Sequence, residues 1–109
     1  MTIRKIHNAV IASGQTKSNQ VYTGFQTSVV GIVTPAELTG TTFTFEGTLD
    51  DSTFVPVYSE GSQYSVTVGT SRYIALDVAV FCGLQSIKIV SGSSEAAERT
   101  IQVVLREVA

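Results

Sequence analysis

Apolar and polar residues alternate along most of this chain, in short runs closed by turn-forming residues about every eight to twelve positions. Alternation with a period of two predicts strands that turn one face toward a core. The runs expected to form strands cover residues 2–12, 21–25, 28–33, 41–47, 53–58, 64–68, 72–76, 84–90 and 99–106. The expected inward-facing sets are Phe43 and Phe45; Tyr64, Val66 and Val68; Ile87 and Ile89; and Ile101, Val103 and Leu105.

Two segments between these runs predict single helical turns. The sequence Thr34-Pro35-Ala36-Glu37 has the form of a capping box with proline at the first helical position. Asp77 can cap a second turn over residues 78–82. Pro56 lacks an amide donor, so the strand that contains it should lie at a sheet edge or carry a bulge.

Eight or nine short antiparallel strands in one sheet would leave an apolar face bare. Two sheets packed face to face bury both apolar faces, so we expect an all-β fold, an antiparallel β-sandwich of jelly-roll-like type. An immunoglobulin-like sandwich is the alternative, but the chain has no Trp and a single Cys. With 109 residues and no linker or repeat, residues 1–109 should form one domain, with 1–8 as a candidate N-terminal arm.

The composition favours a surface that other molecules cover. Charged residues make up 15% of the chain and the net charge is −2, against roughly 25% charged residues in an average soluble domain. No basic block can follow a phosphate backbone, so we expect no nucleic-acid partner. No apolar run has the length of a membrane span or a signal peptide, so we expect no membrane partner.

The chain offers few side chains for catalysis. His7 is the only histidine and stands on an expected strand with no nucleophile motif beside it. Cys82 is the only cysteine, so no disulfide can form within the chain; it is expected to be a small buried apolar residue in a protein made in a reducing cytoplasm. One His and one Cys cannot form a zinc site. We therefore expect a binding protein rather than an enzyme, without a cofactor.

Asp50 and Asp51 are the most concentrated acidic pair, and together with Glu46, Glu60 and Asp77 they are the candidates for an oxygen-rich calcium site. The spacing lacks the dense Asp, Asn and Gly pattern of a calcium loop. Aspartates in a turn more commonly bond to nearby backbone amides. We expect no metal site.

Three groups of segments carry a resemblance to a known family. They are Phe45-Glu46-Gly47-Thr48-Leu49-Asp50-Asp51-Ser52-Thr53-Phe54; the run from Arg72-Tyr73-Ile74-Ala75-Leu76-Asp77 through Phe81-Cys82-Gly83-Leu84 to residues 87–93; and residues 99–106. In this order they resemble the capsid decoration proteins, also called cement or staple proteins, of tailed bacteriophages. The similarity covers residues 27–106 and is greatest to short-tailed phages of the epsilon-fifteen type. Val78 departs from the family, where proline would be expected.

The resemblance implies a structural virion protein that binds the major capsid protein on the outside of the capsid and also binds itself, as a homo-dimer or homo-trimer. The protein would be made in the host cytoplasm and would bridge neighbouring capsid subunits. The alternative is a carbohydrate-type ligand-binding module of a phage tail or fibre. Four tyrosines could provide a sugar-stacking surface for it, although Trp is absent.

The first residues are the candidates for partner binding. Ile3 and Ile6 stand among polar residues ahead of the first turn, and two isoleucines are unusual in a free tail. The segment is either an ordinary first strand or an arm or edge strand that pairs with another subunit or the shell. In the second case Arg4 and Lys5 would meet acidic groups of the partner. The candidate partner-binding residues are Ile3, Arg4, Lys5, Ile6 and His7.

Overall fold

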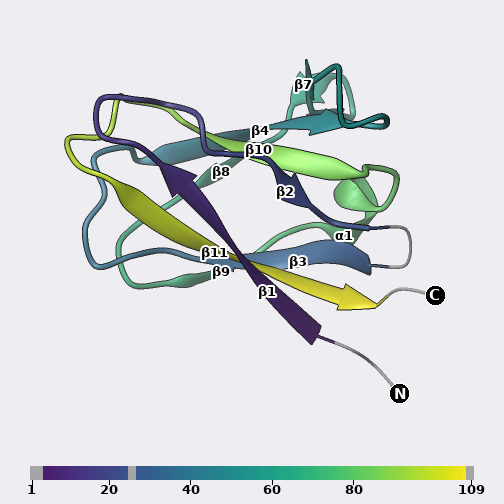
Figure 1. Ribbon diagram of the computed structural model, residues 1–109, viewed down its shortest axis with the longest axis horizontal. Helices are drawn as coiled ribbons and strands as arrows, with labels where there is room; N and C mark the ends of the chain where they lie inside the picture. The colour runs from purple at the N-terminus through teal and green to yellow at the C-terminus, as the bar shows by residue number, and fades with distance from the viewer. Residues whose placement is uncertain (1–3, 25–26, 108–109) are drawn as a thin grey trace.

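The computed structural model describes residues 4–24 and 27–107, which form eleven short strands and one helical turn (Figure 1). The nine expected strand runs are all present. The elements in chain order are β1 (Arg4–Ile11), β2 (Val21–Tyr22), β3 (Thr27–Val33), β4 (Thr42–Thr48), β5 (Val55–Pro56), β6 (Tyr58–Ser59), β7 (Ser62–Gln63), β8 (Ser65–Thr67), β9 (Tyr73–Ala75), α1 (Val78–Phe81), β10 (Ser86–Ser91) and β11 (Arg99–Glu107).

Nine of the strands form two antiparallel layers, visible one above the other in Figure 1, and β6 and β7 form a separate two-stranded sheet. One sheet has the order β1-β11-β3-β9, and the other has the order β2-β10-β4-β5, with β8 also paired to β4. The chain crosses to the opposite sheet at six of the eight connections between successive strands of these two sheets, which is the jelly-roll arrangement. The sandwich prediction is confirmed. The immunoglobulin-like alternative is wrong because consecutive strands β1 and β2 lie in opposite sheets.

The expected inward-facing sets meet between the two sheets. Phe43, Phe45, Val68 and all the expected residues of β10 and β11 are buried, and Tyr64 and Val66 pack against them while remaining partly exposed. The ring of Phe81 meets Phe45 edge to face at a centroid distance of 5.2 Å. This arrangement lets α1 close one end of the core.

A bulge in β3 lets two residues that are three positions apart in the strand both face the core. Val104 pairs with Gly31 and Leu105 pairs with Val29, so Val30 has no partner in β11. Without the extra residue Val29 and Ile32 would face opposite sides of the sheet. With it, both side chains are fully buried.

Of the two expected helical turns, one is present and the other is absent. Asp77 caps α1, its carboxylate accepting from the amide of Ala79 at 3.1 Å. The capping box at residues 34–37 forms no helix. The hydroxyl of Thr34 instead accepts from the amide of Arg72 at 2.9 Å and donates to the carbonyl of Gly69 at 2.5 Å, so a distant turn takes the group that would have capped the helix.

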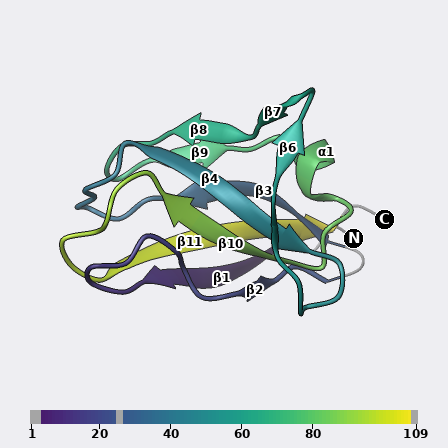
Figure 2. The same ribbon diagram turned by 90° about the horizontal axis from the view of Figure 1, so that it is seen from above.

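Pro56 lies in β5 at the edge of its sheet, as its missing donor requires. The expected strand 53–58 is divided into β5 and β6. The β6–β7 hairpin turns through Glu60 and Gly61, both with positive φ, at the same end of the sandwich as α1, the start of β1 and the end of β11 (Figure 2). Across residues 4–24 and 27–107, no helix has the length and apolar character needed to cross a membrane.

Candidate partner-binding site

The candidate residues Arg4, Lys5, Ile6 and His7 lie together on β1, at the edge of the four-stranded sheet. Ile3 lies outside the described residues. All of the side chains from Arg4 to Asn8 are exposed, whereas Ala9 and Ile11, further along the same strand, are fully buried. The first half of β1 is therefore held by its pairing with β11 but leaves both of its faces open.

An uncharged row crosses the outer face of this sheet at Ile6. Ile6 pairs with Val104, Val104 with Gly31, and Gly31 with Ala75. The ring of Tyr73 lies over Gly31, where an added Cβ would overlap it. Ile6 is 50% exposed and Tyr73 is 57% exposed. The open half of β1 therefore continues into a small apolar surface across four strands.

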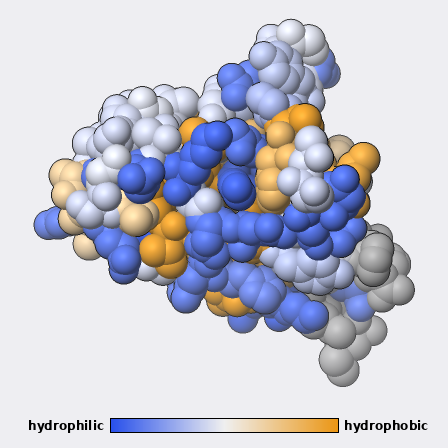
Figure 3. All heavy atoms as spheres, turned by 45° about the horizontal axis from the view of Figure 1, so that its top comes forward, coloured by the Kyte–Doolittle hydropathy of each residue, from blue (hydrophilic) through white to orange (hydrophobic). Residues whose placement is uncertain are grey.

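A second apolar surface lies at the end of the sandwich where β4 ends. A hollow of about 340 Å³ opens there, lined chiefly by Leu49, Val55 and Leu84 and by the polar residues of the β4–β5 turn. Leu49 is 74% exposed. Figure 3 shows apolar residues reaching the surface at this end, among hydrophilic neighbours. The described residues that line the hollow include no aromatic side chain, so it can take an aliphatic group but offers no stacking surface for a sugar.

Asp50 is engaged by its own turn. Its carboxylate accepts from the amides of Thr53 and Ser52, each at 2.9 Å, and from the hydroxyl of Thr48 at 2.8 Å. These hydrogen bonds, the one from Thr53 foremost, lower the pKa of Asp50 to about 2. All three bonds go to Oδ1, so this oxygen is an acceptor fixed inside its own turn.

Asp51 is directed elsewhere by its positive φ of 61°. It accepts from the side-chain amides of Gln20 and Gln85, each at 2.8 Å, and from the hydroxyl of Ser86 at 2.5 Å. The two adjacent aspartates therefore serve different neighbours and do not converge. Of the other candidate oxygen ligands, Glu46 pairs with Lys17 at 2.8 Å. In the described parts of the chain, no three acidic, His or Cys side chains gather closely enough to hold a metal ion.

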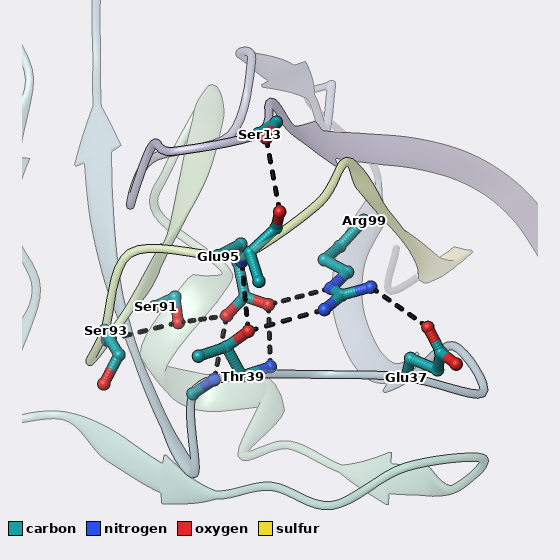
Figure 4. A network of polar contacts seen from close by, with 9 residues as sticks. Ser13, Glu37, Thr39, Ser91, Ser93, Glu95 and Arg99 are labelled. Atoms are coloured by element: carbon teal, nitrogen blue, oxygen red, sulfur yellow. Dashed lines mark hydrogen bonds and ion pairs between the residues drawn. The ribbon is translucent and has the colours of Figure 1, made fainter.

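The loop over residues 91–98 is fixed by a buried carboxylate (Figure 4). Glu95 is 1% exposed. It accepts from the amides of Thr39 and Gly40 at 2.8 and 2.9 Å, from Ser91 Oγ at 2.7 Å and from Arg99 Nε at 3.0 Å. Burial alone would raise the pKa of Glu95, but these four bonds outweigh it and lower the pKa to about 2. With every acceptor site used, this network is structural.

Cys82 is exposed, so its expected buried position is wrong. It follows α1 as the C-terminal cap, and the helix turns Phe81 into the core instead. His7 is also exposed, on β1. The chain's only thiol and only imidazole therefore lie in surface positions.

No family model and no curated protein sequence matches this chain. Solved structures share its fold. It is similar to the SPBc2 prophage-derived protein YomS, with a TM-score of 0.61 and 14% identity over 98% of this chain and 97% of that chain. It is also similar to CBM32-1 from a family 31 glycoside hydrolase of Clostridium perfringens, with a TM-score of 0.56 and 11% identity over 90% of this chain and 75% of that chain.

A third similar structure comes from Bacillus endospore appendages, which form disulfide-linked pili. It has a TM-score of 0.52 and 13% identity over 99% of this chain and 87% of that chain. One sandwich fold thus occurs in proteins with very different descriptions. At identities this low, the comparisons establish the fold alone.

Proposed function

We propose that this chain is a structural virion protein that decorates a phage capsid and stabilises it by bridging neighbouring capsid subunits. The observation that carries the proposal is the open first half of β1, an edge strand whose side chains are exposed on both faces beside an apolar row. Such an edge is suited to binding an extended segment of another protein. Sheet edges left uncovered are otherwise a liability for association.

Two further observations support a phage setting. The similarity to YomS, a prophage-derived protein by its description, extends over nearly the whole length of both chains. The motifs in residues 45–54, 72–93 and 99–106 resemble those of capsid decoration proteins. A small chain of low charge fits a protein that is added in many copies to a finished shell.

Bridging needs at least two capsid-binding surfaces in one oligomer of the decorating protein. A homo-dimer or homo-trimer carries two or three copies of the β1 edge, and each copy can engage a different capsid subunit. Once one copy is bound, the next binds at a high effective concentration, so weak individual contacts add up across the lattice. Two capsid subunits held in this way separate only after the bridge is released.

A carbohydrate-binding module is the second candidate, because CBM32-1 has the same fold. Two observations count against it. The hollow beside Leu49 and Leu84 has no aromatic lining among the described residues, and Asp50 and Asp51 do not converge on a common point. Saturable binding of the labelled protein to one glycan class on an array would favour this candidate over capsid decoration.

The proposal is tested by sedimenting the purified protein with empty capsids of the phage that encodes it. We expect saturable co-sedimentation at a fixed number of copies per capsid. Particles that already carry the protein are the matched control and should take up no more. Recovery of all the protein in the supernatant, with vacant capsids at saturating concentration, would overturn the proposal.

A further inference from the structure

The direction of the main-chain groups along β1 follows from its contact with Asn19. The amide of Val10 donates to Asn19 Oδ1 at 2.6 Å, and the carbonyl of Val10 accepts from the amide of Asn19 at 3.2 Å. The polar groups of Val10 thus face away from β11. In an antiparallel ladder this direction alternates with every residue, and the β1–β11 register is unbroken. Arg4, Ile6 and Asn8 therefore also direct their amides and carbonyls outward.

These outward groups define an open edge, consisting of the main chain of Arg4, Ile6 and Asn8. Among the described residues, no backbone hydrogen bond outside the strand ladders involves any of the three. β1 is the terminal strand of its sheet. The edge is thus complementary to one added strand that offers donors and acceptors at the same spacing.

Positive charge collects at the same place. Arg4 lies directly across the ladder from Arg106, and Lys5 follows on the next position, so three of the seven Lys and Arg residues stand at one corner. No ion pair with any of the three is found within the described residues, whereas Lys17 and Arg99 each have a carboxylate partner. Like charges opposite one another on neighbouring strands destabilise a sheet. A carboxylate of a bound partner would offset the repulsion between Arg4 and Arg106.

The side chain of Ile6 adds an apolar requirement. It stands on the same outer face as Arg4, two residues away, and its cross-strand neighbour Val104 is 8% exposed. A strand added to this edge would place alternate side chains beside Ile6 and beside Arg4. The edge therefore fits an extended segment in which an apolar and an acidic residue are two positions apart.

We propose that the open edge of β1 binds an extended acidic segment of another protein as an additional strand, with its carboxylates at Arg4, Lys5 and Arg106. The inference rests on the proposed function only in taking the other protein to be a capsid subunit. A second copy of β1 is the poorer occupant, because it would bring a second set of cations to the same interface. Self-association would therefore use a different surface.

The proposal is tested with fluorescence anisotropy of a labelled synthetic peptide of about eight residues that repeats the segment Val-Glu-Glu-Thr, so that valine and a glutamate stand two positions apart and the glutamate between them faces the other side. A peptide with lysine in place of glutamate is the matched probe. We expect the glutamate peptide to bind about tenfold or more tightly than the lysine peptide at low salt, and the difference to shrink as salt is added. Equal affinity for the two peptides would overturn the charge assignment.

Substitutions in the edge separate backbone pairing from side-chain contact. Proline at position 6 removes an amide that faces outward, so Ile6→Pro should leave the β1–β11 ladder in place and abolish peptide binding. Ile6→Ala controls for the side chain and should weaken binding less than Ile6→Pro does. Arg4→Glu together with Arg106→Glu should reverse the peptide preference, and the exposed Arg72→Glu should leave it unchanged. Full binding by folded Ile6→Pro would overturn edge pairing.

The same variants distinguish this inference from the proposed function. If Ile6→Pro loses the peptide and also fails to sediment with capsids, the edge is the capsid contact. If Ile6→Pro still sediments with capsids at the normal copy number, the edge inference is wrong while capsid decoration stands. If the unmodified protein binds the peptide but no capsid, the decoration proposal fails. The edge then still binds acidic segments as an added strand, but the partner is not a capsid subunit.

Discussion

The carboxylate of Glu95 accepts a hydrogen bond from Arg99 Nε at 3.0 Å, and the two side chains are only 0% and 11% exposed. Through Glu95 the segment before β11 is tied to Thr39 and Gly40, more than fifty residues earlier in the chain. Removing one partner of such a buried pair leaves the other without compensation. This contact therefore holds together two loops at one end of the sandwich.

Acid should destabilise the fold through Glu95. Its pKa is about 2 in the folded protein against the ordinary 4.5, so the ionised carboxylate favours the folded state. That contribution is complete above a pH of about 4.5 and is lost as the pH falls toward 2. Urea unfolding across this range should show a falling free energy of unfolding, and Glu95→Gln should flatten the fall.

Two variants sharpen that measurement. Asp50→Asn should remove a separate share of the same acid dependence, because the pKa of Asp50 is also about 2. Glu98→Gln alters an exposed carboxylate in the same loop and should keep the dependence of the unmodified protein. An identical acid dependence in Glu95→Gln and Glu98→Gln would contradict the structural role given to Glu95.

Truncation in the core should weaken the fold far more than truncation beside it. Ile101 is fully buried and pairs with Ala9, so Ile101→Ala should lower the free energy of unfolding by about 2–4 kcal/mol. Thr100 is exposed on the opposite face, and Thr100→Ala should change that energy by about 0.5 kcal/mol or less. Chemical denaturation measures both, and equal losses would contradict the assigned facing of β11.

Gly40 is required by the close approach of Ser91. A Cβ added at Gly40 would overlap Ser91 Oγ, which donates to Glu95. Gly40→Ala should therefore destabilise the protein by about 1–3 kcal/mol. Ser91→Ala removes the overlapping atom. The double variant should therefore lose less free energy of unfolding than the sum of the losses measured for the two single variants. A double-mutant cycle measures this coupling, and simple additivity would contradict the overlap.

Cys82 should react with a thiol reagent such as Ellman's reagent in the native protein, because its side chain is exposed. Cys82→Ser should not impair the biological role, because Cys82 follows α1 and does not belong to the exposed half of β1. The control is the same reaction after complete denaturation, which should release no additional thiol. A thiol that reacts only after denaturation would contradict the exposed position.

The strands and the sandwich could be predicted because local alternation with a period of two determines which side chains are buried. Features that depend on distant contacts could not. Glu95 reads as part of a polar loop, and only its contacts with Thr39 and Gly40 make it a buried anchor. Thr34 has the sequence of a helix cap, but its hydroxyl is taken by Arg72 and Gly69. The β6–β7 strands are too short to show alternation.

The candidate site was predictable in part for the same reason. Sequence reasoning identified residues 4–7 from their unusual composition. It could not identify Arg106, which joins them only through the β1–β11 register. That the main-chain amide and carbonyl of Ile6 point away from β11 follows only from the contact between Val10 and Asn19. No pattern within the first strand indicates which of its amides are left open.

The bridging claim is tested most directly by the temperature at which capsids release their DNA. Phage particles made without this protein should release DNA, detected by a fluorescent dye, at a lower temperature than complete particles. Adding the purified protein back should restore the higher temperature, with the rise following the number of bound copies. Particles that bind the protein to saturation and still release DNA at the lower temperature would contradict the account.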